Sequence, residues 1–122
     1  MNDKGKDLKL RTKKFAIDVV KYVEAMPEGN FKFTIGKQLI RCGTSVGANY
    51  RSACRGRSKA EFNAKLGICE EESDESMFWL EVIMETRDYN PTDTKRLHTE
   101  AEELLKIFVS SLNTSRGGPR NS

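Results

Sequence analysis

The segment with the clearest chemical character in this chain is "YRSACRGRSK", residues 50–59. It contains Arg51, Arg55, Arg57 and Lys59 and no acid. Guanidinium and ammonium groups bind phosphate oxygens, and an uncompensated cluster of them is typical of surfaces that contact a nucleic-acid backbone. The segment therefore predicts nucleic-acid phosphate contacts that do not depend on the base sequence.

The two halves of the 122-residue chain carry opposite net charges. Residues 1–60 hold 14 Lys and Arg against 5 Asp and Glu, whereas residues 61–122 hold 7 against 13. Within the first half, residues 31–60 contain no acid. Two partners suit such a segment: a phosphate backbone, or the acidic half of a neighbouring subunit.

Four other polar residues indicate structural pairing instead. Glu72 and Glu75 belong to the acidic run "EEESDE" and share a helix side with apolar residues. In a helical hairpin that turns near Gly56, Arg41 lies opposite this run, so we expect an ion pair with Glu72 and Glu75. Asn49 completes the set, with a hydrogen bond either across the bundle or to its own helix.

The same hairpin leaves the cations near its turn poorly compensated. Arg51 and Arg55 face residues 62–65, and Glu61 is the nearest acid. We therefore expect these two arginines to be available to a partner.

Residue types suited to catalysis are sparse. His98 is the single histidine, and no acid and nucleophile stand near it with the arrangement of a triad. The glycines of "GTSVG" lack the Gly-Lys-Ser/Thr ending of a phosphate-binding loop. Cys42, Cys54 and Cys69 lack metal-ligand spacing. We predict a protein that is not an enzyme, with no catalytic residue, metal site or cofactor.

Four helix-compatible segments must hold these residues in place. In each of them apolar residues recur at steps of three, four and seven, the period of one buried helix face. Pro27, Gly56 and Pro91 separate the segments. We expect one domain of four helices, over about residues 7–25, 34–55, 58–87 and 92–112.

Side chains that can cap a helix predict where three of these helices begin. Thr34 is the expected cap of the second helix, and Ser58 with Glu61 has the spacing of a capping box for the third. Thr92 or Asp93 is the expected cap of the fourth.

Short connections between four helices predict an all-α fold, an antiparallel up-and-down four-helix bundle that assembles as a ring-like homo-oligomer. We expect the bundle to occupy residues 7–112. The N-terminus, residues 1–6, is expected to be flexible, and the polar C-terminal tail, residues 113–122, to be disordered.

A strip of glycines lies between the apolar and the basic side of the second helix. Gly36, Gly43 and Gly47 each weaken the helix, so their presence favours a close approach of another backbone. The neighbour is either a helix of the same chain or a helix of another subunit.

The chain has neither a signal-peptide pattern at Met1–Leu10 nor an apolar run long enough to span a membrane. Its cysteines fall inside helical patterns, which indicates reduced thiols. We expect a bacterial cytoplasmic protein without a membrane partner.

Several motifs together resemble one known family, the four-helix-bundle proteins encoded in intervening sequences of bacterial large-subunit (23S) ribosomal RNA genes. The resemblance covers about residues 8–112. It is carried by Arg41-x2-Thr44-Ser45-x3-Asn49, the turn Arg51–Ser58, Glu61-Phe62 and Glu72-x2-Glu75-x3-Trp79-Leu80.

This resemblance implies a non-enzymatic bundle that forms a homopentameric ring and has no established biochemical activity. The family is similar in fold to the accessory variability proteins of diversity-generating retroelements, which bind a reverse transcriptase and nucleic acid through a basic surface. The expected partners are therefore further copies of the chain, RNA or DNA, and, by fold analogy alone, a reverse transcriptase or other protein. The alternative function is a structural or protein-interaction scaffold, in which the basic surface contacts subunits or partner proteins.

Overall fold

The computed structural model describes the backbone of residues 3–117 and the side chains of residues 5–117. It contains the helices α1 (Asp3–Glu24), α2 (Lys37–Cys54), α3 (Lys59–Thr86) and α4 (Pro91–Ser115). A π-helical turn, η1 (Lys32–Gly36), directly precedes α2. No β-strand occurs within residues 3–117, so the expected all-α fold class is confirmed.

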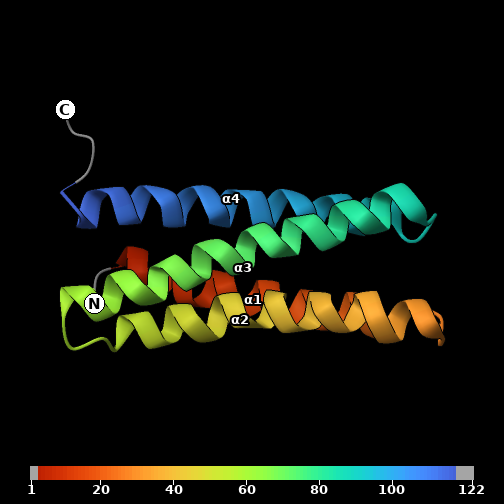
Figure 1. Ribbon diagram of the computed structural model, residues 1–122, viewed down its shortest axis with the longest axis horizontal. Helices are drawn as coiled ribbons and strands as arrows, with labels where there is room; N and C mark the ends of the chain where they lie inside the picture. The colour runs from red at the N-terminus through yellow and green to blue at the C-terminus, as the bar shows by residue number, and fades with distance from the viewer. Residues whose placement is uncertain (1–2, 118–122) are drawn as a thin grey trace.

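The four helices lie alongside one another as an elongated bundle (Figure 1). In it α1 packs against α2, α2 against α3 and α3 against α4, whereas α1 contacts α4 over a shorter stretch. Residue numbers rise along α2 while they fall along α3, because Val46 lies beside Cys69 and Cys42 beside Ser76. The start of α1, the α2–α3 turn and the end of α4 lie at the same end of the bundle (Figure 1).

One apolar core runs through the bundle, and every helix contributes one face to it. The faces expected from the sequence are the buried ones, since each core residue is at most 5% exposed. Burial of this kind contributes about 1.5–3 kcal/mol for each large side chain. The largest fully buried apolar side chains are Phe15, Val19, Leu39, Val46, Leu66, Leu80, Ile83, Leu97, Leu104 and Phe108.

The glycine strip of α2 packs against α1 of the same chain. A Cβ atom on Gly47 would lie 3.1 Å from the backbone oxygen of Thr12, and one on Gly43 would lie 3.0 Å from both methyl carbons of Val19. Because α1 fills this space, the alternative of a subunit contact through the strip is wrong. The glycines are needed for the close approach of two helices within one subunit.

The start of the second helix differs from the expectation. Thr34 does not cap it but lies inside η1, where its hydroxyl donates a hydrogen bond to the carbonyl of Asn30 at 2.7 Å. Helical hydrogen bonding already begins upstream, since the N–H of Phe33 donates to the carbonyl of Gly29. Gly29 has φ 147°, a conformation that favours glycine, and this residue turns the chain into the helix.

The third helix begins as expected, with the Ser58 hydroxyl accepting a hydrogen bond from the Glu61 N–H at 3.1 Å. The Glu61 carboxylate in turn accepts from the backbone N–H of Arg57. The fourth helix does not use Thr92 or Asp93 as its cap. Asn90 holds that position in a left-handed conformation and Pro91 is the first helical residue, a position proline favours because its missing N–H would have no partner there.

Two helices are longer than the sequence predicts. α1 includes residues 3–6, which we expected to be flexible, so Gly5 weakens the helix there without ending it. α4 continues past Leu112 to Ser115, and Gly117 with φ 86° follows its C-cap residue Arg116, which is a common helix ending. The remaining parts of the expected flexible ends, residues 1–2 and 118–122, lie outside the described residues.

Within the described part of the chain, no helix combines the length and the hydropathy that crossing a membrane requires.

Candidate nucleic-acid interface

The four cations singled out in the sequence lie together around the α2–α3 turn. Arg51 belongs to the last turn of α2, Arg55 is its C-cap residue, Arg57 is in the turn and Lys59 is the first residue of α3. All four are exposed. We call these four residues the basic end; the start of α1 and the end of α4 are close to it (Figure 1).

The basic end has no acid within ion-pair distance among the described residues. Within residues 5–117, the side chains of Arg51, Arg55, Arg57 and Lys59 form no ion pair or hydrogen bond. Glu61 is the nearby acid, but its carboxylate accepts the backbone N–H of Arg57 at 3.0 Å. The positive charge of this end is therefore directed to solvent.

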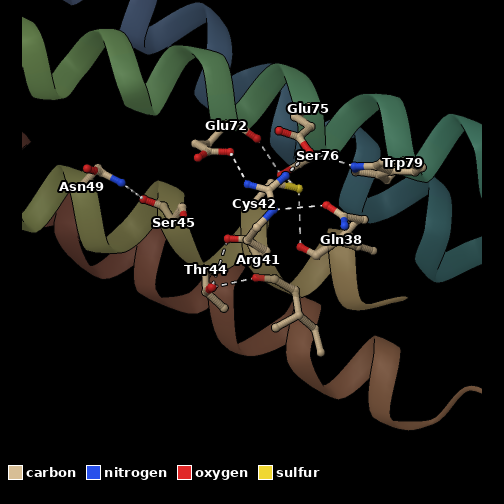
Figure 2. A network of polar contacts seen from close by, with 12 residues as sticks. Gln38, Arg41, Cys42, Thr44, Ser45, Asn49, Glu72, Glu75, Ser76 and Trp79 are labelled. Atoms are coloured by element: carbon tan, nitrogen blue, oxygen red, sulfur yellow. Dashed lines mark hydrogen bonds and ion pairs between the residues drawn. The ribbon is translucent and has the colours of Figure 1, made fainter. Parts of the chain in front are cut away.

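Arg41 has the opposite environment, because it lies between α2 and α3 and points toward Glu72 and Glu75 (Figure 2). Its Nη1 lies 3.4 Å from Glu72 Oε1, its Nη2 contacts the Glu75 carboxylate, and its Nε donates to Gln38 Oε1 at 3.1 Å. Trp79 donates its Nε1–H to the same Glu75 carboxylate at 3.0 Å. Two carboxylates of the same chain thus neutralise Arg41.

Burial affects the acids of this network. It raises the pKa of Glu72, because a charged carboxylate is less well solvated in the groove, and Arg41 opposes this shift. The nearby Glu75 adds to the increase in the pKa of Glu72 by like-charge repulsion. The network consequently depends on Arg41 to keep two carboxylates charged close together.

Asn49 makes a local hydrogen bond. Its Nδ2 donates to the carbonyl of Ser45 at 2.9 Å, one turn earlier in α2 (Figure 2). The bond across the bundle is not formed, since Asn49 satisfies its amide within its own helix.

The ring of Tyr50, the residue next to Arg51, is not available for base stacking. Tyr50 is 5% exposed and packs against Phe108, with 6.0 Å between the ring centroids. Burial also raises the pKa of its hydroxyl. Nucleic-acid contacts at this end would therefore rely on charge and on phosphate, with little reading of bases.

Sequence reasoning missed a groove between the start of α1 and the end of α4. It has a volume of about 960 Å³. Leu8, Phe62 and Ile107 line it together with Tyr50, and Lys106 adds a further exposed cation near the basic end. Only the packing of distant segments creates this groove, so the sequence carries no local signal for it.

The two buried cysteines and the histidine, which are residue types suited to catalysis, are buried or paired in this fold. Burial raises the pKa of Cys42 to about 11 and that of Cys69 to about 12, so both thiols are protonated at neutral pH. His98 Nε2 lies 2.7 Å from Glu81 on α3. In the described part of the chain, no three His, Cys, Asp or Glu residues are grouped as metal ligands would be.

Comparison with known proteins identifies relatives of this chain. A family model described as 23S rRNA-intervening sequence protein matches residues 7–110. A similar crystal structure is that of a protein of unknown function from the S23 ribosomal protein family of Bacteroides thetaiotaomicron VPI-5482. The two chains are 29% identical with a TM-score of 0.82, covering 89% of this chain and 97% of the other.

No match to this chain was found among curated proteins. The family match nevertheless extends over nearly all of the bundle, from α1 into the last turns of α4. It includes the Arg41 network and the basic end. The chain therefore belongs to the 23S rRNA-intervening sequence protein family.

Proposed function

We propose that this protein is a non-enzymatic accessory protein that self-associates and binds nucleic acid through the basic end. The observation that carries the proposal is the difference between cations on one helix. Arg41 has two acidic partners, whereas Arg51 and Arg55, both exposed, have none among residues 5–117. An exposed cluster of unneutralised cations attracts phosphate groups.

The proposed contacts are with the phosphate backbone of RNA or DNA. The basic end offers guanidinium and ammonium groups, whereas the ring of the adjacent Tyr50 is buried. Binding is then strongly dependent on salt and only weakly dependent on base sequence.

Self-association is the second part of the proposal. The family resemblance implies an antiparallel up-and-down bundle assembled as a ring-like homopentamer. Symmetry would repeat the basic end once per subunit, so one nucleic-acid strand could contact several copies, which increases avidity. We place the protein in the bacterial cytoplasm, where its three free cysteines would stay reduced.

A second candidate function is a structural or protein-interaction scaffold. In it the basic end would contact acids of a second subunit or of a partner protein, by fold analogy a reverse transcriptase. The observation that favours it is the set of exposed acids on α3, which includes Glu71, Asp74 and Glu85.

Fluorescence anisotropy with a labelled mixed-sequence RNA and a duplex DNA of matching sequence tests the first function. We expect the unmodified protein to bind at low salt, with an affinity that falls steeply as salt rises. In the Arg51→Ala/Arg55→Ala/Arg57→Ala variant, each lost phosphate contact reduces the slope of log affinity against log salt by about 0.7–0.9. For three lost contacts, the slope is expected to fall by about 2–3 in total.

The matched control removes three exposed cations from the opposite end of the bundle. They are Lys37 at the start of α2, Arg87 at the end of α3 and Lys95 near the start of α4. It changes the net charge by the same amount and should leave the affinity within about twofold, since distant exposed charges are screened. Equal losses in both triple variants would contradict a specific role of the basic end. Absence of binding by the unmodified protein would leave the scaffold as the better function.

A further inference from the structure

The outward face of α1 carries aliphatic side chains among lysines. Five residues follow one another along this face at helical spacing, and all five are exposed. Leu10 is 62% and Ile17 44% exposed. We call this row the α1 stripe: Lys6, Leu10, Lys13, Ile17 and Lys21.

The outward face of α3 carries an aromatic side chain among acids. Its row of five exposed residues has the same helical spacing. At its centre, Phe78 is 53% exposed. We call this row the α3 stripe: Glu71, Asp74, Phe78, Glu81 and Glu85.

Phe78 packs against a neighbouring ring. Its ring lies edge-to-face on Trp79, with 4.9 Å between the centroids. Trp79 donates a hydrogen bond to Glu75, which also pairs with Arg41. Large aromatic side chains are common anchors of interfaces, and one that already packs on a neighbour has less conformational entropy to lose when a partner covers it.

Most charges of the two stripes have no partner within the subunit. In residues 5–117, no ion pair involves Lys6, Lys13 or Lys21, and in the α3 stripe only Glu81 has one, with His98. The exposed side of α4 differs, because it mixes both charge signs and its large apolar side chain, Val109, is only 37% exposed. Its exposed residues include Thr92, Lys95, Arg96, Thr99, Glu103, Lys106, Val109 and Ser110.

We propose that the α1 stripe of one subunit binds the α3 stripe of a second copy of this chain. Lysines then meet acids, while Leu10 and Ile17 meet Phe78. The proposal rests on the self-association in the proposed function and names the two surfaces that carry it.

The positions of the stripes determine the kind of assembly. α1 and α3 are diagonal in the bundle, since α2 and α4 each contact both of them. The two stripes therefore face away from each other, and a contact between them is heterologous. A growing chain of copies has a free α1 stripe at one end and a free α3 stripe at the other. Further copies can therefore add until the two ends meet and a ring closes.

Charge reversal on each stripe, followed by their combination, tests this pairing. One variant carries Lys6→Glu/Lys13→Glu/Lys21→Glu, and the other carries Glu71→Lys/Asp74→Lys/Glu85→Lys. In light scattering, we expect each variant to fall from the oligomer mass to the 13.8 kDa of one chain. The chain with both sets should regain the parental mass, because its stripes are again complementary.

Two controls accompany the test. Lys95→Glu/Lys106→Glu reverses charges on α4 and should retain the parental mass. Circular dichroism melts show whether each variant is folded. Where a triple variant is unfolded, the single substitutions Ile17→Ser and Phe78→Ser take the place of the two triple variants. Each of these substitutions should reduce the oligomer mass.

Several results would overturn the pairing. They are a single-stripe variant that keeps the parental mass, a combined variant that stays monomeric, and a parent that is itself monomeric. A variant of the α1 stripe that keeps its mass but loses RNA affinity would mean that RNA, not a second copy, occupies that face. Anisotropy measured on the same samples separates these outcomes from a failure of the basic end to bind nucleic acid.

Discussion

Two groups of cations on α2 have opposite surroundings, although the sequence around both is equally free of acids. Arg41 is level with the acidic run of α3, and Glu72 and Glu75 reach it across the groove. Arg51 and Arg55 lie where α3 begins, and the acid there, Glu61, caps the helix instead of pairing with a side chain. The charge of a residue therefore says less about its role than the segment that packs opposite to it.

The middle of α2 and its end also differ in packing. Around Gly47 the helix touches the backbone of α1, while the last turn carries exposed arginines. The middle therefore serves stability and the end is free for a partner. Substitutions along α2 should separate these two roles.

The largest effect on stability is expected from Gly47→Val. The new side chain must fit where a Cβ atom would already lie 3.1 Å from the Thr12 backbone oxygen, and a backbone cannot move aside as a flexible side chain can. We expect a loss of about 2–3 kcal/mol in the free energy of unfolding, measured by urea denaturation. The control Ala48→Val, at an exposed position one residue further on, should cost about 0.5 kcal/mol. Equal losses for both would mean that helix propensity alone is responsible.

A smaller effect is expected from Arg41→Ala. It leaves Glu72 and Glu75 close together without a cation, and we expect it to cost about 1–2 kcal/mol at pH 7. Nucleic-acid affinity should change by less than about twofold, because Arg41 is already neutralised in the subunit.

The cost of Arg41→Ala should depend on pH. Arg41 lowers the pKa of Glu72, so in the variant this pKa is further above its ordinary value. A carboxyl with a raised pKa in the folded state favours folding while it is protonated and loses that contribution as pH rises through its pKa. The deficit relative to the parent should be smallest below the ordinary glutamate pKa of about 4.3 and grow toward pH 7. A deficit that does not vary with pH would refute the electrostatic explanation.

The smallest effect on stability is expected from Arg51→Ala/Arg55→Ala. Neither side chain has a partner in the described part of the chain, so the free energy of unfolding should fall by at most about 0.5 kcal/mol per residue. This figure includes the loss of a favourable cation at a helix C-terminus. Nucleic-acid binding should be weakened clearly in the same variant. A loss of stability as large as that of Arg41→Ala would remove the difference between the two groups.

Most of the fold could be predicted from the sequence, because helix faces follow a local period. The apolar steps of α1 to α4 identified the buried residues, and Ser58 with Glu61 marked the start of α3. The start of α2 was not predictable from Thr34, since its hydroxyl serves equally well as a cap and as a partner of an earlier carbonyl. Asn90 was missed as the cap of α4, because its left-handed conformation depends on how the α3–α4 turn closes.

The candidate site was predictable in part. The position of Arg41 opposite Glu72 and Glu75 followed from the arithmetic of one helical hairpin. The groove beside Leu8 and Ile107 did not, because its walls come from all four helices. The α1 and α3 stripes were equally hidden, since a periodic pattern says which face is apolar but not which of the remaining residues point away from every neighbour.

The sequence by itself determined the four helices, their core faces, the family and the surplus of cations near the α2–α3 turn. These properties depend on residue types within a few turns of each other. Only the tertiary structure decided that the glycine strip packs on α1, that a groove forms beside Leu8 and Ile107, and that two stripes of opposite charge face away from each other. The physical reason is that a close approach, an ion pair or an exposed face is defined by what lies beside it in space, and here the neighbours come from distant parts of the chain.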